Sequence, residues 1–200
     1  MATPQSPQTR LWTREEYHRA ADCGVFRPDE RLELLEGELI YKMSPQSNPH
    51  AAGVGLSAEI LRDAFGKGFS IREEKPIVLS HRSEPEPDIV LVAGSARQNP
   101  RHPTPQNALL VMEISESTLA FDQNQKAAAY ARSGVKDYWI LNLRQRRLEV
   151  RRNPGLIGTD EYGYHSLLLY TEDQSASPLA PPHLSISVAD LLPSLPPSTE

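Results

Sequence analysis

The sequence predicts an α/β protein with a mixed β-sheet flanked by helices. Two nearly continuous apolar runs, 88–92 and 109–114, are typical of strands that are buried on both faces. Segments with a helical spacing of apolar residues are interspersed with further strand candidates along the chain. One cysteine, Cys23, excludes an intrachain disulfide and a cysteine-based zinc site.

The composition is that of one globular domain. The chain has 200 residues, of which 38% are hydrophobic and 24% charged, and its net charge is -5. We expect a single domain over 11–192, a disordered tail over 1–10 and a proline-rich tail over 193–200. The N-terminus lacks a signal-peptide core and no apolar run approaches the roughly 18 residues of a membrane span, so a soluble, cytoplasmic protein without a membrane anchor is expected. The negative charge argues mildly against tight non-specific binding of nucleic acid, without excluding local contact with DNA.

The N-terminal part is predicted to form a helix and a β-hairpin. Thr13 and Glu16 have the spacing of a capping box, so a helix should run from Thr13 to about Cys23. Two short apolar stretches surround Gly37 within 31–43, which is the pattern of a β-hairpin.

Helices and strands are expected along the rest of the chain. The predicted helices are 49–66 and 122–133, and the predicted strands are 70–79, 88–92, 109–114, 136–142, 147–152 and 165–170. The loop over 93–107 is long for a structural connection, and loops of this length are more often functional or mobile.

Two acidic residues occupy the predicted buried strands. Asp88 lies where an extended, proline-containing segment enters an apolar strand, and Glu113 directly follows four apolar residues. A buried carboxylate is costly unless it is paired or holds a cation, and two of them at neighbouring strand ends would repel each other. A divalent cation would remove both costs, and Mg²⁺ is commonly held by one or two carboxylates. Asp88 and Glu113 are therefore candidate ligands of Mg²⁺ or Mn²⁺.

A positive charge is expected beside these carboxylates. Asp122, Lys126 and Tyr130 are spaced by four and share one face of the helix that directly follows the strand of Glu113. Lys126 could orient an attacking water or stabilise charge in a phosphorane-like transition state. The structural alternatives are a Glu113–Lys126 ion pair and an Asp88 that caps its strand.

The order of these segments resembles the PD-(D/E)xK nuclease signature, with Pro87-Asp88 followed after a loop by Glu113-Ile114-Ser115. More narrowly, the chain resembles the Uma-type family of putative restriction endonucleases over most of Leu11–Leu143. The stretches that carry this resemblance are Glu33–Leu39, Ser44-Pro45 with His50, Glu86–Asp88, Val111–Ser115, Asp122–Lys126 and Gly134–Trp139.

The resemblance implies a restriction-endonuclease-like core and a Mg²⁺-dependent endonuclease that acts on DNA. Asp88 and Glu113 would be the metal ligands. Ser115 stands where the superfamily signature has its lysine, and the resemblance implies that Lys126 replaces it.

Three further residues are auxiliary candidates. The resemblance places His50 at the site, whereas the structural alternative is a helix-start residue bonded to the backbone. Glu33 is a similar candidate, with simple solvent exposure as its alternative. Asp122 is expected to be a helix N-cap or an early-turn acid, with a supporting role at the site as a further option.

Two other functional classes remain open from the sequence. One is a catalytically silent nuclease fold that serves as a binding module, and the other is a structural homodimer joined through exposed strands. The five arginines in 144–152 indicate either a solvated hairpin or a rim that contacts phosphates. Tyr138 and Trp139 are expected to pack in the core.

Overall fold

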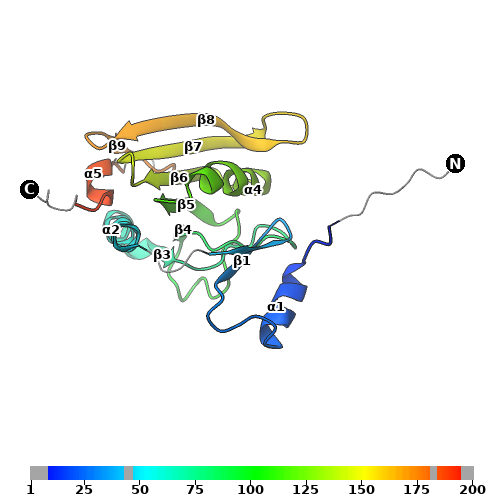
Figure 1. Cartoon of the computed structure of the whole chain (residues 1–200). Coiled ribbons are helices and arrows are strands. Elements are labelled where there is room, and N and C mark those ends of the chain that lie inside the picture. The colour runs from blue at the N-terminus through cyan, green and yellow to red at the C-terminus, as the bar shows by residue number, and fades with distance from the viewer. Residues whose placement is uncertain (1–8, 43–46, 181–183, 195–200) are drawn as a thin grey trace, which may run out of the picture.

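The computed structural model describes residues 9–42, 47–180 and 184–194. A six-stranded mixed sheet with the order β3-β4-β5-β6-β7-β8 forms its centre, with helices packed against it (Figure 1). The predicted fold class is confirmed. Residues 1–8 and 195–200, which hold most of the two predicted tails, lie outside the described residues, as does the family-matching pair Ser44-Pro45.

Most of the predicted elements are present. The strands are β1 (Leu32–Leu35), β2 (Glu38–Tyr41), β3 (Phe69–Glu73), β4 (Ile89–Ala93), β5 (Ala108–Ser115), β6 (Asp137–Asn142), β7 (Arg147–Leu156), β8 (Tyr162–Thr171), β9 (Ser175–Ala176) and β10 (Ile186–Ser187). The helical segments are α1 (Arg14–Asp22), α2 (Asn48–Phe65), the 3₁₀ turn η1 (Gly66–Gly68), α3 (Leu119–Phe121), the π-helical turn η2 (Asp122–Lys126), α4 (Ala127–Ser133) and α5 (Val188–Leu191). None of the helices in the described ranges has both the length and the apolar character of a membrane span.

The sheet separates two apolar clusters. β5 and β6 pair in parallel, and the helical segment α3–η2–α4 makes the crossover between them, whereas the other neighbours in the sheet are antiparallel. Leu61 of α2 packs in one cluster with Met112 and Trp139, and Tyr130 of α4 packs in the other with Tyr138. Adjacent residues of a strand point to opposite faces. The predicted core positions of Tyr138 and Trp139 are therefore confirmed, one on each face.

The N-terminal helix and the β-hairpin are both present, as predicted. Thr13 and Glu16 make both hydrogen bonds of the capping box. The N–H of Trp12 donates to the carbonyl of Gly37 at the tip of the β1–β2 hairpin. Gly37 has a φ of +89°, and a Cβ there would lie 2.6 Å from Cβ of Leu11. Only glycine therefore fits both this turn and the close approach of Leu11.

Strand lengths differ from those predicted at both ends of the sheet. The strand expected over 70–79 ends at Glu73, because Glu74 has a φ of +47° and three prolines in the following fifteen residues remove backbone donors. Both strands of the β7–β8 hairpin are longer than predicted. β7 extends beyond the predicted range 147–152 at its C-terminal end, and β8 extends beyond 165–170 at both ends. The hairpin continues past Asn153, which has a φ of +59°, with Pro154 still opposite Tyr164.

The C-terminal elements β9, β10 and α5 were not predicted from the sequence. Ile186 and Val188 are buried against the α2 side of the sheet, and β9 and β10 pair only with each other. Each of these elements has four residues or fewer, which is too short for a hydrophobic period to be recognised.

Candidate active site

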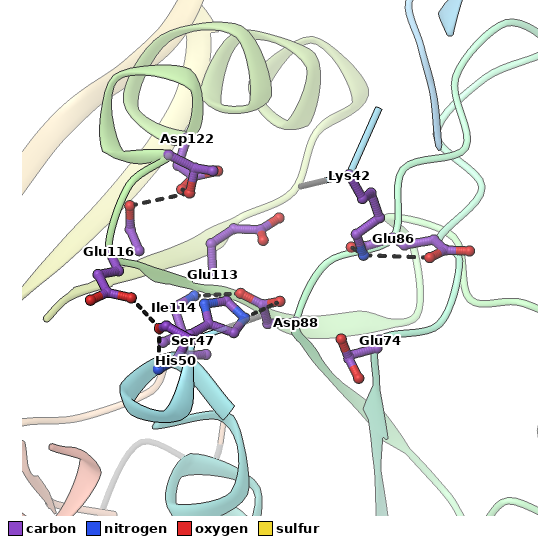
Figure 2. A network of polar contacts seen from close by, with 12 residues as sticks. Lys42, Ser47, His50, Glu74, Glu86, Asp88, Glu113, Ile114, Glu116 and Asp122 are labelled. Carbon is purple, nitrogen blue, oxygen red and sulfur yellow. Dashed lines mark hydrogen bonds and ion pairs between the residues drawn. The ribbon is translucent and has the colours of Figure 1, made fainter. Parts of the chain in front are cut away.

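A cleft of about 430 Å³ brings all six predicted site residues together. Figure 2 shows four of them, His50, Asp88, Glu113 and Asp122. It lies between the β1–β2 hairpin, the start of α2, the strands β4 and β5, and the helical segment after β5. Glu33, His50, Asp88, Glu113, Asp122 and Lys126 all line it. They come from five separate parts of the chain, so their convergence is a property of the fold.

The end of the β4–β5 ladder brings Asp88 and Glu113 into one cleft. The ladder ends at the antiparallel pair Ile89–Met112; Asp88 directly precedes Ile89, and Glu113 directly follows Met112. Both side chains line the cleft. The N–H of Ile114 donates to Oδ2 of Asp88 at 2.7 Å and fixes that carboxylate at the strand edge.

Glu113 is buried and hydrogen-bonded through one oxygen. Its Oε1 accepts hydrogen bonds from Nζ of Lys126 at 2.9 Å and from the hydroxyl of Tyr130 at 2.7 Å. Burial, which outweighs the opposing effect of Lys126, raises the pKa of Glu113 to about 8. The sequence placed Tyr130 on the same helix face as Lys126 but gave it no role, and its bond to Glu113 is a contact that sequence reasoning missed.

Asp88 and His50 form a second pair in the cleft. Nε2 of His50 lies 3.4 Å from Oδ1 of Asp88. Burial acts to raise the pKa of Asp88, but hydrogen bonding and charge from His50, together with Lys126 and the N–H of Ile114, outweigh it and lower that pKa. The hydrogen bond with Asp88 is the main cause that raises the pKa of His50.

His50 starts α2 and also lines the cleft. Its backbone N–H donates to Oγ of Ser47, the N-cap of α2, at 3.2 Å, as expected of a helix-start residue. Its imidazole meanwhile faces Asp88 in the cleft. The hydroxyl of Ser47 also donates to Glu116, so the start of α2 is tied to the chain that follows β5 (Figure 2).

Lys126 carries its charge between two acids. Nζ lies 2.9 Å from Oε1 of Glu113 and 3.6 Å from Oε1 of Glu33. Desolvation is the largest single effect and lowers the pKa of Lys126, but the surrounding carboxylates together raise that pKa well above 10.5. Lys126 is therefore protonated at any physiological pH.

A π-helical turn delivers Lys126 to the cleft. η2 is continuous with α3 and α4, so the helix starts at Leu119 and not at Asp122. The N-cap interpretation of Asp122 is therefore wrong, because Asp122 already lies in the second turn, where its Oδ2 accepts a hydrogen bond from the Thr118 hydroxyl at 2.7 Å. Burial is the main cause that raises the pKa of Asp122.

Two buried side chains hold this π turn from the sheet side. The hydroxyl of Tyr138 donates to the carbonyl of Asp122 at 2.9 Å. Nε2 of Gln123 donates to both carboxylate oxygens of Glu149, at 2.8 and 3.0 Å. A π turn frequently marks a functional site, and here contacts with β6 and β7 anchor it to the sheet.

Glu33 points into the cleft and not into solvent. Its Oε2 accepts a hydrogen bond from the N–H of Glu86 at 2.9 Å, and its Oε1 faces Lys126. All four residues of β1 are buried, because the segment around Glu84 pairs with Leu34 on the open side of the hairpin. The alternative of simple solvent exposure for Glu33 is wrong.

Three charged residues of the cleft were not among the predicted site residues. Lys42 donates to the carbonyl of Glu86 at 3.0 Å, Arg31 lies 3.4 Å from Glu74, and Glu116 accepts from Ser47. Arg31 and Lys42 close the open end of the hairpin, where the N–H of Lys42 donates to the carbonyl of Arg31. Their positions at the two ends of the predicted hairpin were the available signal.

Four arginines of the segment 144–152 form ion pairs within the protein. Arg146 pairs with Glu172, Arg147 and Arg151 pair with Glu149, and Arg152 pairs with Asp137. In the described part of the chain, none of these arginines lines the cleft.

The donor set fits a hydrated hard cation better than a cage of protein ligands. Within the described ranges, no three His, Cys, Asp or Glu side chains are grouped so that they could hold a metal ion by themselves. Mg²⁺ usually takes only one or two carboxylates and completes its shell with water and substrate phosphate. Oε2 of Glu113 makes no hydrogen bond to the described residues, and Asp88 lines the same cleft.

The charge balance of the cleft agrees with this assignment. Five acidic residues line the cleft, namely Glu33, Asp88, Glu113, Glu116 and Asp122, against the three bases Arg31, Lys42 and Lys126. The residues present therefore fit a hydrated Mg²⁺ or Mn²⁺ ion.

Comparisons with known proteins agree with the sequence motifs and the fold. The family model Uma2, described as "Putative restriction endonuclease", matches residues 14–189. The chain matches no curated protein. A solved structure from Anabaena variabilis ATCC 29413, described as a putative nuclease belonging to DUF820, is similar with a TM-score of 0.64 and 15% identity, over 90% of this chain and 97% of that one. At this identity the likeness shows a shared fold. Since the family model spans most of the chain, the protein belongs to the Uma2 family of putative restriction endonucleases.

Proposed function

We propose that the protein is a Mg²⁺- or Mn²⁺-dependent endonuclease that hydrolyses phosphodiester bonds in DNA. The observation that carries this proposal is the convergence of Asp88 and Glu113, from the adjoining ends of β4 and β5, in one cleft with the charged ammonium of Lys126. Family membership supports the same activity. A DNA substrate also accords with the cytoplasmic location expected from the sequence.

Asp88 and Glu113 would hold the cation. Both are buried, yet each has an oxygen that is not fully engaged by the backbone or by Lys126 and Tyr130. The chemistry that Mg²⁺ supplies in such a site is neutralisation of charge on the phosphate under attack and activation of water.

Lys126 would act through its charge and not as a base. With a pKa well above 10.5, it does not accept a proton from water at neutral pH. Its ammonium can instead orient a water by hydrogen bonding and stabilise negative charge that develops on the phosphate. Glu113 and Tyr130 fix the position of this group, since both bond the same Oε1.

His50 is the candidate proton donor. The hydrogen bond with Asp88 raises the pKa of His50 above 6.5, so the imidazolium is more populated near neutral pH than in a free histidine. The side chain is half-buried at the wall of the cleft, where a leaving oxygen could reach it. Glu33 and Asp122 would support the site, by facing Lys126 and by adding negative charge around it.

The test is DNA cleavage by purified protein. Supercoiled, linear and single-stranded DNA are incubated with Mg²⁺, Mn²⁺ or a chelator, for the wild type and for Asp88→Asn and Glu113→Gln. Cleavage that requires the metal and is lost in both variants supports the proposal. Asp63→Asn and Glu59→Gln are matched controls, because both residues are exposed on α2 and lie outside the cleft. Cleavage that persists in Asp88→Asn would show that the activity belongs to another site or to a contaminant.

A catalytically silent binding module is the second candidate. The observation that favours it is the ion pair of Lys126 with Glu113, which satisfies both charges without a metal. Such a module would bind DNA or a metal equally well in the wild type and in Lys126→Met, with no cleavage by either. Binding without cleavage on all three DNA forms would select this candidate.

A further inference from the structure

The two edges of the central sheet are built differently. β3 is five residues long, carries Arg72 and Glu73, and packs against α2. β8 is ten residues long and contains no charged residue and no proline. Natural edge strands are usually shortened or protected by charge, proline or a covering element, because an open edge pairs with other strands. β3 follows this rule and β8 does not.

The outer side of β8 is open. Between its ends, β8 makes no backbone hydrogen bond to any described element other than β7. Figure 1 shows β8 at the margin of the sheet, beyond β7. Every second N–H and C=O of the strand therefore faces away from β7 and needs water or another strand as its partner.

Three consecutive leucines are exposed on this edge. Leu167 and Leu169 are each 51% exposed and Leu168 is 42% exposed. Since neighbours in a strand point to opposite faces, apolar surface is presented on both faces of the sheet at once. A strand with solvent on its outer side would gain from polar residues at these positions, whereas a strand with a neighbour on each side would bury leucines here.

We propose that β8 pairs antiparallel with β8 of a second copy of this chain, with the two-fold axis at Leu168. In this register Leu168 faces its own counterpart, and Leu167 faces Leu169 of the second copy. The overlap covers 165–171, which holds no charged residue. Glu161 and Glu172, the acidic residues nearest its two ends, do not face each other in this register.

The occupant is a second copy because the strand is complementary to itself. The two-fold register matches three leucines with three leucines, and the two six-stranded sheets join into one. The pairing closes at a dimer, since the opposite edge, β3, carries the charges that block further addition. The interface is narrow, so association should depend on concentration.

This interface is independent of the proposed nuclease site. Asp88 directly precedes β4 and Glu113 lies in β5. The strands β6 and β7 separate both residues from β8. None of the three leucines lines the cleft. Dimerisation can therefore be tested whether or not the protein cleaves DNA.

Sedimentation of the full chain over a range of concentrations tests the proposal. The wild type should show a reversible species of twice 22.3 kDa. In Leu167→Lys/Leu169→Lys, like charges face each other across the two-fold axis, and the dimer dissociation constant should rise at least about tenfold. Both positions are half-exposed, so the monomer should keep its circular dichroism spectrum. A wild type that is monomeric at every concentration overturns the proposal.

Two controls define the interface. Val25→Lys/Leu179→Lys removes apolar side chains that are 63% and 47% exposed elsewhere, and it should leave the dimer intact. In a Cys23→Ser background, Leu168→Cys should form a disulfide-linked dimer on mild oxidation, because opposite residues lie about 4.5–5.5 Å apart, within disulfide range. Leu156→Cys, at the end of β7, should not form this cross-link. The proposed pairing is contradicted if Val25→Lys/Leu179→Lys weakens the dimer as much as Leu167→Lys/Leu169→Lys does. It is also contradicted if the protein is dimeric but Leu168→Cys forms no cross-link.

Discussion

The ammonium of Lys126 lies 2.9 Å from Oε1 of Glu113, and this oxygen is the one that also accepts the Tyr130 hydroxyl. Oε2 of Glu113 is left without a hydrogen bond to the described residues. The sequence left two interpretations of Glu113 open, a structural ion pair with Lys126 and a metal ligand. The geometry makes them compatible, because each role needs a different oxygen.

The first prediction concerns the stability of this pair. Above about pH 8, where Glu113 is ionised, Lys126→Met should destabilise the fold by about 3–5 kcal/mol, because it leaves the buried carboxylate of Glu113 without its partner. Adding Glu113→Gln should recover part of that loss, since the uncompensated charge is removed, while cleavage stays absent. Urea unfolding of the two single variants and the double variant gives the interaction energy. Lys67→Met, at an exposed position, should change stability by less than about 0.5 kcal/mol.

A negligible interaction energy would mean that the ion pair contributes nothing to folding. Full nuclease activity in Lys126→Met would separately refute the role of Lys126 as the charge that stabilises the transition state.

The second prediction concerns metal binding at Asp88. Mn²⁺ should raise the melting temperature of the wild type, because a ligand that binds only the folded state stabilises it by mass action. Asp88→Asn should lose most of this shift and keep its fold, since the amide can still accept the N–H of Ile114. Asp63→Asn should retain the full shift. Equal shifts in all three proteins would place the bound ion away from Asp88.

The third prediction concerns pH in the metal-free protein. Burial raises the pKa of Glu113 from 4.5 to about 8, so between these values the folded state binds more protons than the unfolded state. The contribution of Glu113 to stability is therefore fully present below about pH 4.5 and is lost as the pH rises to about 8. Thermal unfolding with a chelator, from acidic to mildly alkaline pH, measures this slope.

Glu113→Gln is the matched variant for this titration, because its amide has no charge to lose. Its stability should fall less steeply with pH than that of the wild type. Parallel curves for the two proteins would show that Glu113 does not titrate in this range.

The fourth prediction concerns the π turn. Gln123→Ala removes both hydrogen bonds to Glu149 and should loosen the turn that carries Lys126. We expect a lower kcat with little change in KM or in metal affinity, and a stability loss of about 1 kcal/mol for each bond lost. Gln125→Ala is the control, since Gln125 is exposed in the same turn. Identical kinetics of the two variants would remove Gln123 from the positioning of Lys126.

Much of the fold follows from local patterns in the sequence. The apolar runs of β4 and β5 predicted strands buried on both faces, and the Thr13–Glu16 spacing predicted a capped helix. These features depend on neighbours in the chain, which a sequence displays directly. The candidate residues of the cleft were likewise visible, because Asp88 and Glu113 are charges inside apolar segments whose burial has to be compensated.

Other features depended on partners that are distant in sequence. Glu33 turns into the cleft because the segment around Glu84 covers the hairpin, and Tyr130 bonds Glu113 because the crossover helix packs over β5. The π turn adds a residue to a helix without any change in apolar spacing, since Tyr138 and Glu149 supply the bonds that hold it.

The sequence by itself indicated the family, the order of the main strands and helices up to β8 and the identity of the six candidate site residues. Only the tertiary structure decided which oxygen of Glu113 is engaged, where the helix of Lys126 begins and which sheet edge is open. The physical reason is the range of the interactions. Strand burial, helix capping and turn formation are set within a few residues, whereas hydrogen bonds to a buried carboxylate depend on side chains that meet only after the sheet has formed.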